Sequence, residues 1–167
     1  REDHKNPFWY GMGEQPPNSL FYRLRIFRLL WKYVQQQQIS QRTVAYYNYL
    51  YSSNNPYLPS NKRSLHAIIR LCEKQNIPLI ILCFPVLYRL NNNYPFTHLH
   101  AQIEHSVMSA GARSVFYIDM LPYFQGKDER ELWVHDTDHH PNEYAHQIIA
   151  KTLVSFILSK KFIVRIK

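Results

Sequence analysis

The sequence predicts a mixed α/β domain in which helices cover a parallel β-sheet in a three-layer α/β/α arrangement. Three observations indicate this class. Helical and strand patterns alternate along residues 63–159, an order typical of parallel strands joined by helical crossovers. Residues 78–84 are apolar throughout, as expected for a strand that is buried on both faces. Of the 167 residues, 46% are hydrophobic, which suffices for the core of one domain.

The first part of the chain divides into an irregular lead, residues 1–17, and a helix and loop region, residues 18–62. The lead mixes aromatic residues with Gly and Pro. From 20 to 37 apolar residues recur every three or four positions with arginine and lysine between them, which predicts a basic amphipathic helix. Tyrosine-rich residues 46–51 continue this helix, and a loop follows. The helix could lie on an anionic membrane surface or dock on the domain with its basic face outward.

The α/β core, residues 63–159, begins with a helix that runs from Ser60 or Asn61 to about Gln75. An apolar stripe at helical spacing supports this helix, formed by Leu65, Ile68, Ile69 and Cys72. Asn76 fits the left-handed position that often ends a helix. The buried strand 78–84 comes next, and Pro85 ends it because proline cannot donate to a ladder.

A second helix and strand repeat this order. Residues 97–110 show helical spacing and stop at Gly111, and residues 115–118 form a strand that is followed by Asp119. We expect the three histidines of this helix, His98, His100 and His105, on the surface. The tail 160–167 is interpreted as an edge strand or a frayed end.

Titratable side chains concentrate between residues 135 and 146, in a predicted loop before a helix whose first turn holds Pro141. Three chemistries fit the spacing. His140 could act as a general base whose ring Asp138 orients. A divalent metal could be bound by a larger set, namely His135, His139, His146 and either Asp136 or Asp138. The third possibility is a solvated loop that caps the helix.

Asp138-His139-His140-Pro141-Asn142, followed by Ala145-His146 and an apolar helix, resembles the last conserved block of the SGNH (GDSL-type) hydrolases. The resemblance implies a flavodoxin-like fold and an ester-cleaving Ser-His-Asp mechanism, with His140 as base, Asp138 as the orienting acid, and no metal or organic cofactor. Asp136 and His139 fit an alternative register of the same block. We prefer Asp138 and His140 because His140 directly precedes Pro141-Asn142. The family usually has Gly where this chain has Ala145.

The resemblance covers roughly residues 60–158, since residues 77–85 and 114–122 are similar to two of the family's strands. The blocks that supply the nucleophile and the oxyanion hole are missing. No Gly-Asp-Ser or Gly-x-Asn-Asp occurs, and the chain has only four glycines. We therefore expect either the C-terminal part of a longer SGNH-like protein, incomplete at its N-terminus, or a diverged member without the nucleophile. In both cases this chain alone should be inactive.

Charge and composition restrict the partners. The net charge is +8, but no run of five like charges occurs, so we expect scattered basic residues and no nucleic-acid partner. The implied substrate is a small-molecule, lipid or sugar ester. A non-catalytic binding module, holding an acidic partner through the aromatic and basic N-terminal region, is the alternative. The sequence shows neither a signal peptide nor a run of about 18 apolar residues, and compartment and oligomeric state stay open.

Cys72 and Cys83 lie in a helical pattern and in the apolar strand, respectively. We expect both to be small buried apolar residues, with one disulfide bridge at most.

Overall fold

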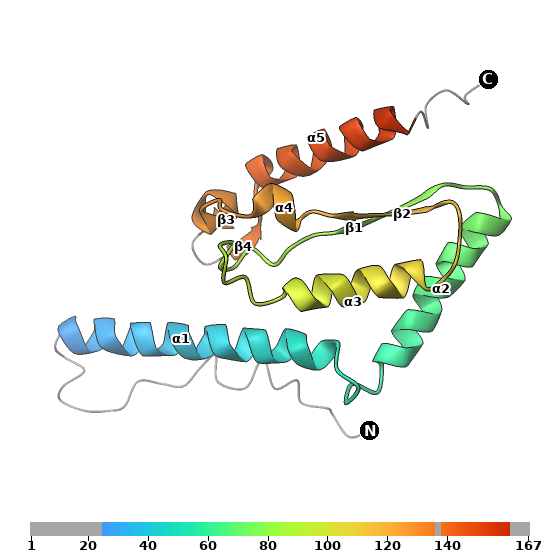
Figure 1. Ribbon diagram of the computed structural model, residues 1–167. Helices are drawn as coiled ribbons and strands as arrows, with labels where there is room; N and C mark the ends of the chain where they lie inside the picture. Colours follow the sequence, from blue (N-terminus) through green and yellow to red (C-terminus); the bar gives the residue numbers. More distant parts are fainter. Residues whose placement is uncertain (1–24, 136–137, 161–167) are drawn as a thin grey trace. The chain divides into compact units, whose positions relative to one another are not determined.

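The computed structural model describes residues 25–135 and 138–160, with the backbone alone for residues 31–40 (Figure 1). The expectations for the irregular lead 1–17 and for residues 161–167 of the tail lie outside the described residues. The chain groups into two units, residues 1–61 and 62–167, and each is described by itself.

The first unit is built on α1, Arg25–Leu50, which continues through the tyrosine-rich stretch as predicted. Four of its large apolar side chains are exposed, between 42% and 66%: Ile26, Phe27, Leu29 and Leu30. A turn follows in which Asn55 is buried. Its amide nitrogen donates to the carbonyl of Leu50 at 2.7 Å, and its Oδ1 accepts from the backbone nitrogen of Tyr57 at 3.0 Å. This short polar side chain therefore fixes the turn together with the backbone hydrogen bonds, such as that from the nitrogen of Asn55 to the carbonyl of Ser52 at 3.1 Å.

The helix α2, Leu58–Lys74, begins two or three residues before the predicted start at Ser60 or Asn61. Ile69, in the middle of α2, is buried, whereas Ile68 of the predicted stripe is 53% exposed. Asn76 has a φ of 56°, which confirms the left-handed residue expected after the helix. Near the end of α2, the carboxylate of Glu73 accepts from the backbone nitrogens of Arg113 and Ser114 at 3.2 and 3.0 Å. Glu73 thereby ties the end of α2 to the segment that leads into β2.

Two parallel strands form the sheet of the second unit. β1, Leu79–Cys83, pairs with β2, Val115–Asp119, in a register that places Leu79 beside Val115 and Cys83 beside Asp119. The crossover between them contains α3, Thr97–Met108. The mixed α/β class and the parallel pairing are thus confirmed. No further strand joins this sheet among the described residues.

Helices lie on the two sides of the strand pair. On one side, Val107 of α3 and Ile69 of α2 pack with Val115 in a buried apolar cluster. On the other side lies α5, Glu143–Ser159, whose Phe156 meets Phe116 edge to face with ring centroids 5.7 Å apart (Figure 1). Neighbouring residues of a strand point to opposite faces, so Val115 and Phe116 serve the two sides in turn.

The connection from β2 to α5 differs from the predicted loop. It contains the short helix α4, Leu121–Phe124, and the 3₁₀ helix η2, Glu129–Leu132. An antiparallel hairpin of β3, Trp133–His135, and β4, Asp138–Pro141, follows. The loop prediction for this stretch was therefore wrong. Pro141 ends β4 instead of opening the helix, because the next residue is the N-cap of α5.

Both cysteines are free. Cys83 is buried as predicted, but Cys72 is only half-buried. Among the described residues, no helix combines the length and the hydrophobicity that crossing a bilayer would require.

Candidate active site

Asp138 and His140 are joined side chain to side chain in β4. Oδ1 of Asp138 pairs with Nδ1 of His140, and the same oxygen accepts from the backbone nitrogen of His140 at 3.1 Å. A carboxylate only accepts hydrogen bonds, so Nδ1 carries the proton and Nε2 of the neutral ring is left with its lone pair. The side chain of His140 is 86% exposed and that of Asp138 is 50% exposed. Nε2 bonds to no described residue and is open to an incoming group.

The two hydrogen bonds from His140 change the chemistry of the carboxyl group. The bond from the His140 side chain, and then the bond from its backbone nitrogen, hold the pKa of Asp138 below its ordinary value of 3.8. Asp138 therefore stays ionised at neutral pH. An ionised acid on Nδ1 fixes the tautomer and stabilises the imidazolium that forms when Nε2 accepts a proton.

His139 faces away from this pair, as strand alternation requires. Its ring lies flat on the indole of Trp133, with centroids 3.8 Å apart and an angle of 15° between the planes. Nε1 of Trp133 donates to the carbonyl of Leu87 at 2.9 Å, which anchors the indole to the segment after β1. The stack on Trp133 holds His139, so His140 is the histidine whose Nε2 can accept a proton from a substrate-side group.

Asn142 fixes the hairpin to the start of α5. Its Oδ1 accepts from the backbone nitrogen of Ala145 at 3.1 Å, which is an N-cap. Its amide nitrogen donates to the carbonyls of Glu131 and Trp133 at 2.8 and 3.1 Å. One side chain thus binds η2, β3 and α5 together. Ala145 is fully buried beside it, so this position admits only a small residue.

The alternative acid–base pair and the metal site that residues 135–146 also suggested have different outcomes. Asp136, the acid of the alternative pair with His139, lies outside the described residues. His135 and His146 form no metal cluster with their neighbours, because no described group of three or more His, Cys, Asp or Glu side chains could hold a metal ion.

A second histidine–aspartate pair, which the sequence analysis missed, lies at the carboxyl ends of β1 and β2. His100 was expected on the surface, but it is 6% exposed. Its Nδ1 lies 2.7 Å from Oδ1 of Asp119 and 3.7 Å from Sγ of Cys83, and its Nε2 lies 3.1 Å from the hydroxyl of Tyr94. The sequence could have predicted part of this group, because Cys83 and Asp119 end two strands and the carboxyl ends of parallel strands meet at one edge of the sheet.

Both ring nitrogens of His100 are hydrogen-bonded. The hydroxyl of Tyr94 accepts from the backbone nitrogen of Val86 at 3.0 Å, so its proton is available to Nε2 of His100. Oδ1 of Asp119 also accepts from the backbone nitrogen of Leu121 at 2.9 Å. Burial alone would lower the pKa of His100, but the hydrogen bonds with Cys83 and Asp119 outweigh it and raise the pKa. Neither ring nitrogen is open, so we assign this group to stability.

The remaining parts of a hydrolase site do not gather around His140. No serine hydroxyl among the described residues hydrogen-bonds to its ring. In comparisons with protein-family models, curated proteins and solved structures, nothing matches this chain.

Proposed function

We propose that this chain carries the acid–base half of an SGNH-like serine hydrolase that cleaves acyl esters. The single observation that carries the proposal is the Asp138–His140 pair, in which Nδ1 is held by an ionised carboxylate and Nε2 is open. Such a pair is the proton-transfer unit that a serine nucleophile needs. Its place in the chain, after two parallel strands and immediately before a capped helix, fits the resemblance of this stretch to the last block of that family.

The chemistry assigned to the pair is a proton shuttle. A serine hydroxyl oxygen attacks the ester carbonyl carbon while Nε2 of His140 takes the hydroxyl proton, and Asp138 stabilises the resulting imidazolium. The bond to the alcohol breaks, and Nε2 returns the proton to the departing oxygen. Water then attacks the acyl-enzyme by the same route and releases the acid. The 167 residues contain neither the Gly-Asp-Ser nor the Gly-x-Asn-Asp motif that supplies the serine and the oxyanion donors in that family, so this chain alone should not turn over esters.

The proposal includes a larger sheet of the three-layer, flavodoxin-like kind. Leu79, Ile81 and Cys83 direct their main-chain groups toward β2, since Leu79 donates to Ser114 and Cys83 accepts from Met120. In a parallel ladder the main-chain groups of the intervening residues, Ile80 and Leu82, then point to the opposite edge of β1. No strand pairs with that edge among the described residues. Parallel sheets are normally covered and extended, so this edge, with its unpaired main-chain groups, is a suitable place for the strands that the family places upstream.

A fluorophosphonate probe, which labels activated serines, tests the proposal on the longest natural gene product that contains this chain. We expect labelling, and we expect His140→Gln to slow ester hydrolysis by about four orders of magnitude. His146→Gln, at an exposed histidine of the same segment, is the matched control and should leave the rate unchanged. An unlabelled but folded product, or equal rates for His140→Gln and the unmodified protein, would overturn the proposal.

A second candidate function is binding of an anionic membrane surface by α1. The exposed side chains of Ile26, Phe27, Leu29 and Leu30 lie between and beside Arg25 and Arg28. Apolar side chains interleaved with arginines suit a helix that lies in the interface of anionic lipids. Sedimentation with phosphatidylglycerol vesicles tests it. Binding should exceed that to phosphatidylcholine vesicles and fall with the double change Leu29→Glu and Leu30→Glu, and no such difference would remove the candidate.

A further inference from the structure

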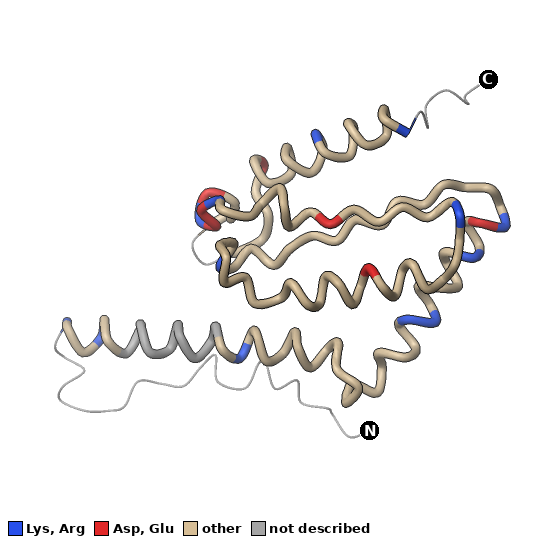
Figure 2. The backbone as a smooth tube through the Cα atoms, in the orientation of Figure 1, with Lys and Arg blue, Asp and Glu red and all other residues tan. Residues whose placement is uncertain are grey.

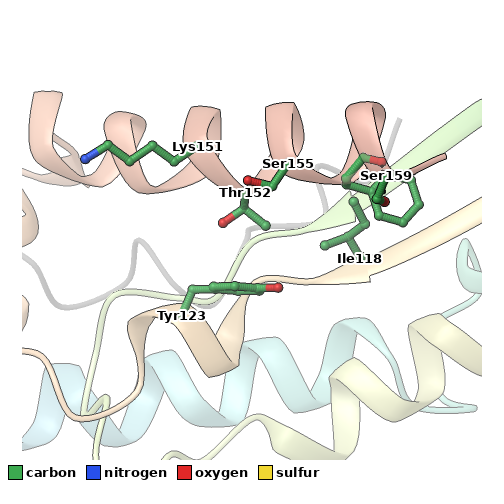
Figure 3. Close-up of a pocket in the computed structure, with 7 residues that line it drawn as sticks. Ile118, Tyr123, Lys151, Thr152, Ser155 and Ser159 are labelled. Atoms are coloured by element: carbon green, nitrogen blue, oxygen red, sulfur yellow. Dashed lines mark hydrogen bonds between the residues drawn. The ribbon is translucent and has the colours of Figure 1, made fainter. Parts of the chain in front are cut away.

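An open cleft lies along α5, away from the hairpin. It has a volume of about 380 Å³, and its walls are α5 on one side and Ile118 of β2 with Tyr123 of α4 on the other. Figure 3 shows Tyr123 beneath the helix, with Thr152 and Ser155 above it and Lys151 at one end. This volume lies within the range of sites for small molecules.

The charge at this cleft is positive. Among the described residues that line it, Lys151 alone carries a formal charge, and no carboxylate faces it. Figure 2 shows how sparsely charges are placed along α5, whose only acidic residue, Glu143, is at its start. Lys151 forms no ion pair with any described residue. Its ammonium group is therefore available to an anion. In Figure 3 the stem of Lys151 runs along the helix away from Ser155, and rotation about its side-chain bonds brings the ammonium group to the cleft.

Four hydroxyl groups line the same cleft, and two of them, those of Ser155 and Tyr123, add free donors to it. Thr152 and Ser159 donate to carbonyls of their own helix, those of Ile148 at 3.0 Å and Phe156 at 2.7 Å. By contrast, the hydroxyls of Ser155 and Tyr123 have no hydrogen-bond partner among the described residues. Lys151 and Ser155 are four residues apart on the helix and share one face. The cleft thus offers three unpaired donors, a set that suits a carboxylate because a carboxylate only accepts.

The remaining lining is apolar. Ile118 is 8% exposed, and Phe156 packs edge to face against Phe116 beneath it, so both present a fixed wall. The ring of Tyr123 extends this wall along the opposite side of the cleft (Figure 3). A ligand that satisfied only the donors would leave these groups in contact with water, whereas an alkyl chain would cover them.

We propose that this cleft binds a free monocarboxylate with a short alkyl chain. The carboxylate accepts from Lys151, Ser155 and Tyr123, and the chain lies against Ile118 and Phe156. The inference does not depend on the hydrolase proposal, because none of these residues belongs to the Asp138–His140 pair.

Calorimetric titration of the 167-residue chain with octanoate tests the site. Octanoate should bind, and octanamide and acetate should each bind at least about tenfold more weakly, because one lacks the charge and the other lacks the chain. Lys151→Met should weaken octanoate binding by about tenfold, and Tyr123→Phe and Ser155→Ala by about threefold each. Lys74→Met, at a lysine that does not line the cleft, is the matched control and should bind as the unmodified chain does.

Each contrary outcome overturns the proposal. Absence of octanoate binding removes the site. Equal binding of octanoate and octanamide removes the role of charge, and equal binding of octanoate and acetate removes the apolar wall. Equal affinity in Lys151→Met and Lys74→Met places any binding elsewhere. Circular dichroism of each variant shows whether it is folded, and Tyr123→Phe, which removes one exposed oxygen, keeps the test available if another variant unfolds.

Discussion

Asp138 holds His140 at two points, through the ring nitrogen Nδ1 and through the backbone nitrogen at 3.1 Å. The two residues are separated by one position in the same strand, so the hydrogen bonds close a small ring of the chain. The imidazole is therefore oriented locally, by its own strand, and does not depend on a distant element of the fold.

This relationship predicts a pH effect with a definite sign. Because the pKa of Asp138 is lowered in the folded state, its ionised form stabilises the fold above the unfolded pKa, and that contribution is lost as pH falls through the folded value. His140→Gln should raise the pKa of Asp138 toward 3.8, since the side-chain bond is its largest cause. A carboxyl-carbon NMR titration measures it. His146→Gln serves as the control, and an unchanged pKa in His140→Gln would contradict the geometry.

Asn142 should be the most sensitive position of the hairpin. Asn142→Ala removes the N-cap and both amide hydrogen bonds, and we expect a loss of about 2 kcal/mol in the free energy of unfolding. Asn142→Asp keeps the capping oxygen but loses the donors to Glu131 and Trp133, so it should cost about half as much. Urea unfolding of both variants separates the two roles. Equal losses would show that the amide donors carry the whole effect.

The buried pair should show the opposite dependence on pH. The pKa of His100 is raised in the folded state, so its charged form stabilises the fold below the unfolded pKa, and this contribution is lost as pH rises through the folded value. Asp119→Asn should therefore cost more stability near about pH 5.5 than near about pH 8.5. A double-mutant cycle with His100→Gln should give a coupling of about 1 kcal/mol at the lower pH. If no coupling energy is found at either pH, His100 and Asp119 do not stabilise the fold as a pair.

Gly111 lies in the turn after α3 with a φ of 70°, and apart from its chain neighbours no atom lies within 4 Å of the place where a Cβ would be. Gly111→Ala should thus cost about 1 kcal/mol through backbone strain alone, without a clash. Gly111→Asn should cost less, because asparagine tolerates the left-handed region. Thermal unfolding of the two variants provides the comparison, and an alanine variant as stable as the glycine chain would contradict it.

The elements with strong periodicity or unbroken hydrophobicity could be predicted from sequence. Helical periodicity predicts the helices around Ile69 and Val107, and unbroken hydrophobicity predicts the strand 78–84. Asn76 and Gly111 indicate where two of the helices end. The hairpin could not, because β3 and β4 have three and four residues and carry titratable side chains in place of an apolar alternation. Its strands are held by the stack on Trp133 and by Asn142, which are tertiary contacts.

The burial of His100 was missed for a related reason. Histidine next to an apolar stripe is ordinarily a surface residue, and its partners Asp119 and Tyr94 are 19 and 6 residues away in sequence. Only the parallel register, which sets Cys83 beside Asp119, brings the group together. At the other pair, residues two positions apart could be linked from sequence alone because their contact is local.

The exposure of the Asp138–His140 pair has a consequence for how this protein could diversify. The side chain of His140 is 86% exposed and that of Asp138 is 50% exposed, so replacing them should leave the architecture intact. The proposed chemistry could therefore be exchanged or abandoned at the cost of only these local hydrogen bonds, while the architecture is retained.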